Sequence, residues 1–187
     1  MRFGSWRTSL LALSVILALR ARELPAQVRV ISLAATAPGD ISVTVTSGAL
    51  QIIPGVVDNA VNNFPAPVVI QTSWNVHPGQ TNTVNLVAYF SIPAQALLGG
   101  SIQIPSSRIL GRMTTGLPVT FTALTQNGLG GVGAAGGSLR LYSVAISGSN
   151  KTAVRTDNLD LQLDLVGFPA LPAGAYAGVL NLRVVTQ

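Results

Sequence analysis

Few residues of this sequence have the chemistry that catalysis requires. The 187 residues include one histidine, His77, and no cysteine, which excludes thiolate nucleophiles, disulfides and any site built from two histidines. A hydrolytic triad needs a base beside its nucleophile, normally a histidine held by a carboxylate. His77 precedes Pro78-Gly79, a turn sequence, and no Gly-x-Ser-x-Gly motif occurs. We interpret His77 as a solvent-facing turn residue and expect no enzyme activity.

The carboxylates are the second group to consider. Asp160 and Asp164 are four residues apart in an alternating segment, about 13 Å along a strand, whereas paired glycosidase carboxylates lie about 5 to 9.5 Å apart. The run from Asp157 to Asp160 offers oxygen ligands for calcium, but it lacks the glycine and the spaced carboxylates of a calcium loop. Zinc would need three or four ligands that the chain cannot assemble. We therefore expect no metal and no cofactor, and a solvated polar strand face here.

Aromatic residues are the candidates for ligand binding, because exposed rings stack on sugars. Trp74, Phe90 and Phe121 share the parity of their apolar neighbours, so we expect them in the core. Tyr89 has the opposite parity from Phe90, and Tyr142 has the parity of Arg140. We predict that Tyr89 and Tyr142 are exposed and name them as the candidate ligand-binding residues.

The segment Asn127–Gly137 is rich in glycine. A glycine loop that cradles phosphate follows a strand, begins a helix and usually carries a lysine there. Here the loop leads into residues 138–142, whose alternation is typical of a strand, and no lysine follows closely. We interpret residues 127–137 as a flexible loop between strands.

Residues 1–26 have the features of a secretory signal peptide: a basic start, about ten apolar residues and a small residue, Ala26, at the expected cleavage site. A short uncleaved anchor is the alternative, although about ten apolar residues cover only half a bilayer as a helix. No later segment has 18 continuous apolar residues, so we expect no stable transmembrane segment after cleavage. The predicted locations are the periplasm, the cell surface or the medium.

Removal of this segment changes the charge of the chain. Of 11 basic and 6 acidic residues, 7 and 5 remain, which gives a net charge of +2. The remaining basic residues are scattered along the sequence, whereas nucleic-acid binding needs a clustered basic face. We expect no nucleic-acid partner.

Residues 27–187 alternate between apolar and polar positions in many short segments, separated by Pro-Gly and Gly-Gly turns. The expected strands are Ile41–Thr46, Ala49–Ile53, Val68–His77, Thr83–Ile92, Val119–Leu124, Ser138–Ile146, Leu159–Leu165, Leu180–Val184 and Val28–Leu33. Residues 93–98 fit a helical turn ended by Gly99-Gly100. About eight or nine strands at this spacing predict one all-β domain, an antiparallel β-sandwich with an immunoglobulin-like outline.

Near the C-terminus, Pro172, Gly174, Tyr176 and Gly178 follow one another at every second position. The physical expectation is a glycine turn, a tyrosine that fixes the corner and a glycine that allows close approach. This segment resembles the last strands of secreted bacterial fimbrial-type domains of the spore coat protein U and pilin-like class. The resemblance implies a surface or fibre subunit that assembles by strand exchange.

Composition favours the same class independently. Charged residues make up only 9% of the chain, against about 25% in ordinary domains, and edge strands without charges can accept a neighbour's strand. Residues 28–33 could be the donor, or simply the first strand of their own sandwich. We therefore expect an exported, non-catalytic structural or adhesive surface protein with a protein partner or its own copies. The alternative is a secreted module that binds carbohydrate or another ligand.

Overall fold

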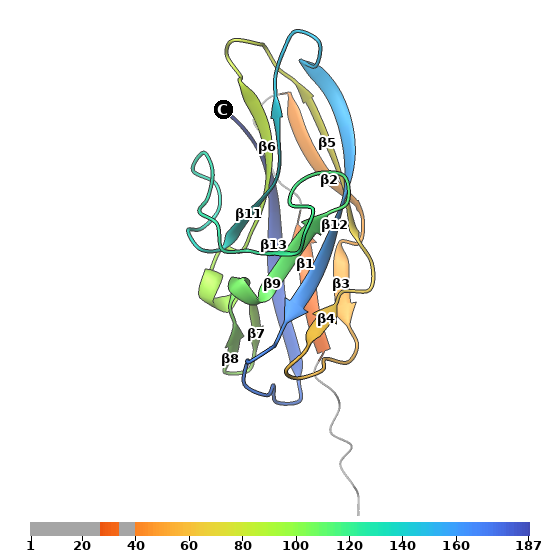
Figure 1. Ribbon diagram of the computed structural model, residues 1–187, viewed down its shortest axis with the longest axis vertical. Coiled ribbons are helices and arrows are strands. Elements are labelled where there is room, and N and C mark those ends of the chain that lie inside the picture. Colours follow the sequence, from red (N-terminus) through yellow and green to blue (C-terminus); the bar gives the residue numbers. More distant parts are fainter. Residues whose placement is uncertain (1–26, 34–39) are drawn as a thin grey trace, which may run out of the picture.

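The computed structural model describes residues 27–33 and 40–187, and for residues 27–33 it describes the backbone alone. The expected signal peptide, residues 1–26, lies outside the described residues. Two β-sheets pack face to face in an elongated sandwich (Figure 1), which confirms the predicted all-β fold. Within the described part of the chain, no helix has the length and apolar character needed to span a membrane.

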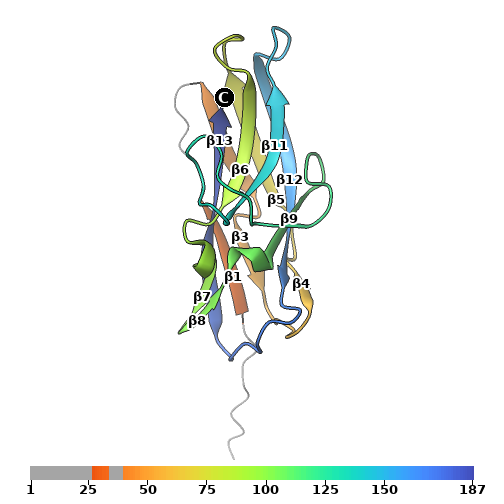
Figure 2. The same ribbon diagram turned by 60° about the vertical axis from the view of Figure 1, so that its left-hand side comes forward.

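One sheet, called sheet A here, has seven strands. The central order is β11-β6-β13-β1-β3, and the β7-β8 hairpin lies beside β13 at one end of the sandwich (Figure 2). The bounds are β1 (Gln27–Leu33), β3 (Leu50–Ile53), β6 (Thr83–Tyr89), β7 (Leu97–Gly99), β8 (Ile102–Ile104), β11 (Ser138–Ala145) and β13 (Ala175–Thr186).

The facing sheet B has six strands in the order β10-β9-β12-β5-β2, with β4 also paired to β12. The bounds are β2 (Ile41–Ser47), β4 (Val61–Asn63), β5 (Val68–Asn75), β9 (Ile109–Met113), β10 (Thr122–Ala123) and β12 (Thr152–Asp164). Two 3-10 turns, η1 (Pro93–Gln95) and η2 (Ser106–Arg108), complete the regular structure of the described residues. The expected helical turn at 93–98 is therefore a 3-10 turn that leads into a short strand.

The core lies between the sheets and is built from the alternating positions of the long strands. Leu159, Leu161 and Leu163 point inward from β12 and are at most 3% exposed. Trp74 and Phe90 are buried with them, as expected. The alternation thus indicates the buried face of each long strand, because successive strand side chains point to opposite faces.

Four features differ from the expectations. The described chain has more strands than eight or nine, because short strands such as β4, β7 and β8 are too brief to show alternation. The strand expected at Val119–Leu124 is reduced to the two residues of β10, and Phe121, expected in the core, is half-buried outside it. Tyr142, expected to be exposed, is 4% exposed. A β-bulge between Arg140 and Tyr142 turns Tyr142 inward, because the extra residue reverses the alternation.

The chain crosses from sheet B to sheet A between β2 and β3. Gly48 stands at this crossing with φ +73°, and a Cβ there would collide with the carbonyl oxygen of Pro67. The Gln51 side chain donates from Nε2 to the carbonyl oxygen of Gly48 at 2.8 Å. Only glycine combines this backbone conformation with such a close approach, so Gly48 allows one edge segment to belong to both sheets.

Strand β1 lies inside sheet A rather than at its edge. It pairs in parallel with β13, from Gln27 opposite Ala175 to Leu33 opposite Asn181. Its other side pairs antiparallel with β3, from Val28 opposite Ile53 to Ile31 opposite Leu50. The backbone of β1 thus bridges two strands that do not pair with each other, and β1 fills the slot between β13 and β3.

Candidate functional site

The two tyrosines predicted to bind ligand do not form one site. Tyr89 is half-buried at the end of β6, where its register partner on β11 is Ser138. Tyr142 lies further along β11, opposite Leu86, and is buried. A buried ring cannot stack on a sugar that arrives from solvent, so this pair does not provide a binding surface.

Tyr142 instead belongs to a charged cluster inside the sandwich. Arg155 and Asp157 are neighbours on the inner face of β12, and the guanidinium donates to both carboxylate oxygens. Thr115 donates its hydroxyl to the same carboxylate at 2.7 Å, and the Arg155 guanidinium lies 4.3 Å from the centre of the Tyr142 ring. Asp157 is 1% exposed, so its charge is neutralised within the fold.

The electrostatics of Tyr142 follow from this environment. Burial raises the pKa of Tyr142 to about 12, against smaller lowering effects of the Thr72 hydroxyl and of Arg155. The hydroxyls of Tyr142 and Thr72 do not reach hydrogen-bond geometry with each other or with another group of the described chain. Tyr142 is therefore neutral across the physiological range and acts as a packing residue beneath Arg155.

The carboxylates of β12 point to different sides of the sheet. Asp157 faces inward to Arg155, whereas Asp160 faces outward and pairs with Arg112 at 2.6 Å. The run 157–160 therefore cannot converge on a calcium ion. Across the described residues, no group of three or more His, Cys, Asp and Glu side chains is placed to hold a metal.

His77 lies in an exposed turn after β5, as the sequence indicates. Its carbonyl oxygen accepts hydrogen bonds from the backbone N–H groups of Gln80 and Thr81, at 3.2 and 3.1 Å. In the described structure, His77 thus stabilises the turn through its backbone carbonyl group.

The glycine-rich segment 127–137 packs against the sandwich. Leu129 and Val132 exchange backbone hydrogen bonds at 2.8 and 3.0 Å, and Val132 is buried. A Cβ at Gly130 would press on the side chain of Val185 in β13. The segment leads into strand β11, as expected, so the helix start that a phosphate loop requires is not there.

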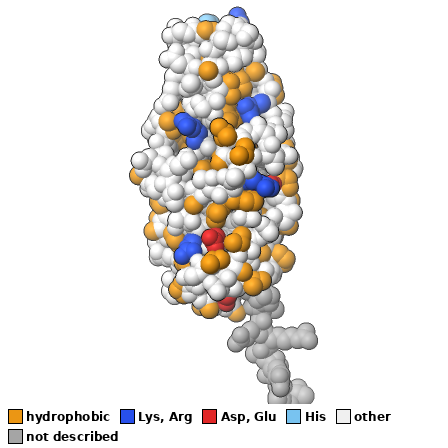
Figure 3. Space-filling model, viewed as in Figure 1, with side chains coloured by type: hydrophobic (Ala, Val, Ile, Leu, Met, Phe, Trp, Pro, Cys, Tyr) orange, Lys and Arg blue, Asp and Glu red, His pale blue; other side chains and the backbone are white. Residues whose placement is uncertain are grey.

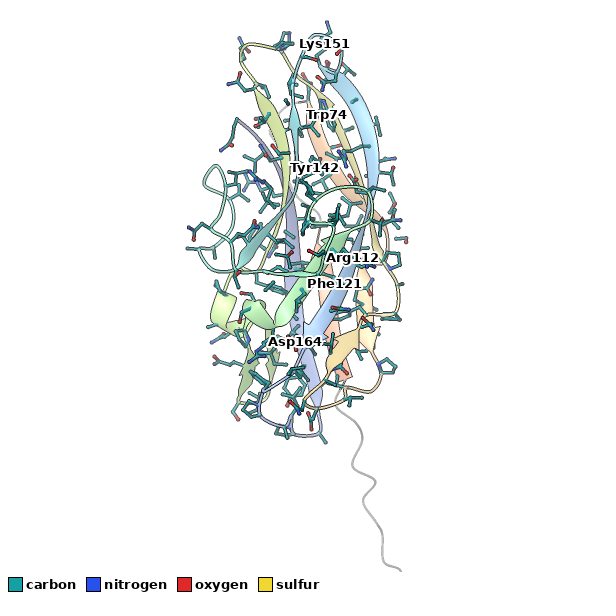
Figure 4. All side chains as sticks on the ribbon, in the orientation of Figure 1. Trp74, Arg112, Phe121, Tyr142, Lys151 and Asp164 are labelled. Atoms are coloured by element: carbon teal, nitrogen blue, oxygen red, sulfur yellow. The ribbon has the colours of Figure 1, made fainter. Side chains whose placement is uncertain are left out.

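A group of outward-facing residues on sheet B was not predicted from the sequence. Arg112 of β9 stands opposite Asp160 of β12, and its guanidinium lies 4.5 Å from the centre of the Phe121 ring. Figure 4 shows Arg112 and Phe121 side by side near β9. The alternation places Asp160 on a polar strand face, but Phe121 and Arg112 meet only through tertiary structure.

This group borders a shallow pocket of about 230 Å³, called the Arg112 pocket here. Asn63 at the end of β4 and the loop from Phe64 to Pro67 that leads to β5 also line this pocket. The Gln162 side chain donates to Oδ1 of the Asn63 amide at 2.7 Å. The pocket therefore combines an aromatic ring, two prolines, an ion pair and an amide.

The C-terminal corner has the geometry expected from its sequence. Tyr176 is buried and donates its hydroxyl to the carbonyl oxygen of Pro172 at 3.0 Å. A Cβ at Gly178 would collide with the carbonyl oxygen of Ala96. The tyrosine thus fixes the corner, and Gly178 lets the chain before β7 pass directly over β13.

The edges of the sandwich carry few charges. Among the described strands, β2 pairs only with β5, and β3 pairs only with β1, so residues 41–53 form one edge across both sheets. This edge contains no charged residue and no proline, the residues that commonly protect edge strands. In Figure 3 the Lys and Arg side chains are spread along the visible face, and no basic patch gathers on it.

Comparison of the chain with known proteins does not add a function to this geometry. No protein-family model matches the sequence, and a search of curated proteins gives no significant match.

Proposed function

We propose that this protein is an exported, non-catalytic structural or adhesive protein of a bacterial cell surface, and that its copies assemble by exchanging strand β1. The observation that carries the proposal is the position of β1 in the slot between β13 and β3. The fimbrial-type features of the C-terminal corner support the same class.

The pairing of β1 makes exchange physically simple. Its partners are distant in sequence, since Gln27 stands opposite Ala175 and Val28 opposite Ile53. The backbone hydrogen bonds of a strand depend on its register and not on which chain supplies it. The same strand of a second copy could therefore fill the slot with the same bonds, which is the basis of domain swapping.

The uncharged edge at residues 41–53 is consistent with assembly. It adjoins the slot, because β3 forms one of the slot's walls. A protein that remains monomeric usually protects such an edge with lysine, proline or a bulge. Neither lysine nor proline is present between residues 41 and 53, and the protection there is limited to one shift of register in β2, between Val45 and Ser47.

A disulfide between register partners tests the exchange. The chain has no cysteine, so the double variant Arg29→Cys/Ala177→Cys carries one new pair at positions that lie opposite each other. Exchange predicts disulfide-linked multimers on a non-reducing gel under mild oxidation. Each single variant alone is the control, because it can form at most dimers. Intramolecular closure alone, at every protein concentration, would argue against exchange.

A deletion provides a second test. Removal of residues 27–34 is expected to abolish ordered polymers seen by light scattering and negative-stain imaging. The truncated protein should then bind a synthetic peptide of residues 27–33, and the same peptide with Val30→Pro should bind far more weakly, because proline lacks a backbone N–H. Polymers that persist after the deletion would contradict a donor role for β1.

The carbohydrate-binding alternative loses the residues on which it depended, since Tyr142 is buried and Tyr89 lies apart from it. A sugar site would have to be formed by other residues.

A further inference from the structure

The outer face of sheet B brings three strands together beside the Arg112 pocket. One row of register partners runs across β4, β12 and β9 and consists of Asn63, Gln162 and Leu110. The next row on the same face consists of Asp160 in β12 and Arg112 in β9. Strand β12 thus presents two polar side chains on the same face, each already paired with a neighbouring strand. The row is fixed by the register of β4 and β9 on the long strand β12.

The ion pair at the centre of this face is accessible. The side chains of Arg112 and Asp160 are 40% and 25% exposed. Arg112 uses one Nη atom on Asp160, and its Nε is buried without an acceptor among the described residues, so a ligand meets the Nη groups and not Nε. The guanidinium and the carboxylate therefore retain hydrogen-bonding capacity beyond their mutual contact, since a guanidinium has five donors and a carboxylate about four acceptor sites.

The apolar part of the pocket lining consists mainly of side chains that contain rings. One face of the Phe121 ring packs on the Arg112 guanidinium, so a ligand stacks on the other face, and Pro65 and Pro67 also line the pocket. Ring carbons and pyrrolidine carbons suit the C–H faces of a pyranose, the contact through which proteins commonly hold sugars. With about 230 Å³, the pocket lies below the range of drug-sized sites, about 300 to 1,000 Å³, and suits a single ring.

The charges select the class of ligand. An anionic ligand would be attracted by Arg112 but repelled by the Asp160 carboxylate, which lies 2.6 Å from the guanidinium. A cationic ligand would be attracted by Asp160 and repelled by Arg112. A hydroxyl group donates to a carboxylate and accepts from a guanidinium, so adjacent hydroxyls of a neutral sugar match the pair without breaking it. The Asn63 amide, exposed at the rim, adds a further donor and acceptor.

We propose that the Arg112 pocket binds one ring of a neutral sugar, with Phe121 as the stacking wall and the Arg112–Asp160 pair as the hydroxyl-recognising group. This inference deepens the adhesive role proposed above and in that sense rests on it. It does not depend on β1, because the pocket is formed by sheet B and its loops.

The test uses protein expressed as the full chain and purified after any processing, with glucose, galactose, mannose and N-acetylglucosamine as probes. Saturable chemical-shift changes on titration with at least one of these sugars are expected, together with binding to neutral ligands on a glycan array. Phe121→Ala should weaken binding about tenfold, consistent with the loss of a ring contact. Tyr89→Ala is the matched control, because it removes a half-buried ring from sheet A and should leave the affinity unchanged.

Asp160→Asn keeps the shape of the pocket and removes a charge, so it serves if Phe121→Ala fails to fold. Asp160→Asn should also weaken the binding of neutral sugars, because it replaces one acceptor oxygen. The affinity of the wild type for a neutral sugar should change little with salt concentration. The proposal is overturned if none of the four sugars binds, if only charged glycans bind, or if Phe121→Ala and Asp160→Asn leave affinity intact. Light scattering on the same samples measures assembly independently of sugar binding. If the protein forms polymers but binds no sugar, this inference is overturned and the proposed assembly through β1 is not.

Discussion

Arg155 and Asp157 form an ion pair inside the sandwich, two positions apart on the same strand and on its inner face. Residues at this spacing point to the same side of a strand, and the carboxylate receives two N–H groups from the guanidinium and the hydroxyl of Thr115. The charge of Asp157 is thus compensated where solvent does not reach it. This arrangement allows a charged pair to sit next to the hydrophobic core.

Asp157→Asn is expected to lower the free energy of unfolding by about 2–3 kcal/mol, because it leaves Arg155 without its counter-charge in a partly buried position. The matched control is Asp160→Asn in the exposed pair with Arg112, where the loss should be below about 1 kcal/mol. Urea denaturation of both variants measures the difference. Equal losses would show that the inner pair contributes no more than the surface pair.

Tyr142 gives the fold a dependence on alkaline pH. Its pKa is about 12 in the folded protein because of burial, and about 10 when unfolded. Below pH 10 both states keep the proton, so stability is unaffected. Between about pH 10 and 12 the unfolded state releases the proton while the folded state retains it, and this residue's contribution to stability falls by up to about 3 kcal/mol.

The measurement is chemical denaturation from neutral pH to about pH 11, with Tyr142→Phe as the comparison. The variant cannot ionise at this position, so its stability should decline less over the alkaline range than that of the wild type. Parallel curves for the two proteins would mean that Tyr142 ionises as readily in the fold as in the unfolded chain.

Gly178 and Gly174 belong to the same C-terminal corner but differ in their surroundings. A Cβ at Gly178 would collide with the backbone oxygen of Ala96, whereas a Cβ at Gly174 has nothing within 4 Å. Gly178→Ala should therefore destabilise the protein by about 2–3 kcal/mol, since backbone must shift to accommodate the methyl group. Gly174→Ala should change stability by less than about 0.5 kcal/mol, and thermal unfolding of the two variants compares them directly.

Alternation predicted the fold class and most long strands because it is a local property of the chain. In β12, the inward leucines identify the buried face without knowledge of any partner strand. Strand β9 was not predicted, because Gly111 takes an inward position and interrupts the apolar pattern. A Cβ there would press on the side chains of Leu139 and Leu159, so the tight packing of the core explains why a glycine stands at this position.

The candidate sites were less predictable because they depend on contacts across the sheets. Tyr142 points inward because of a bulge in β11, and no residue near it in the sequence predicts that bulge. Phe121 meets Arg112 only because the segment before β10 folds over the outer face of β9. The parallel pairing of β1 with β13 joins residues 148 positions apart, from Gln27 to Ala175, beyond the range of any local pattern.

Tyr142 and Tyr176 are both buried, but only one hydroxyl is satisfied. Tyr176 donates to the carbonyl oxygen of Pro172 at 3.0 Å, whereas the Tyr142 hydroxyl has no hydrogen-bond partner among the described residues. Tyr176→Phe should therefore lower the free energy of unfolding at neutral pH by about 1–2 kcal/mol, because it removes a bond and leaves a carbonyl unpaired. Tyr142→Phe should be neutral or slightly stabilising, because it removes a buried polar atom that gains nothing in the fold. Urea denaturation of the two single variants measures both changes in the free energy of unfolding. An equal loss of stability in both variants would mean that the Tyr142 hydroxyl is hydrogen-bonded in solution.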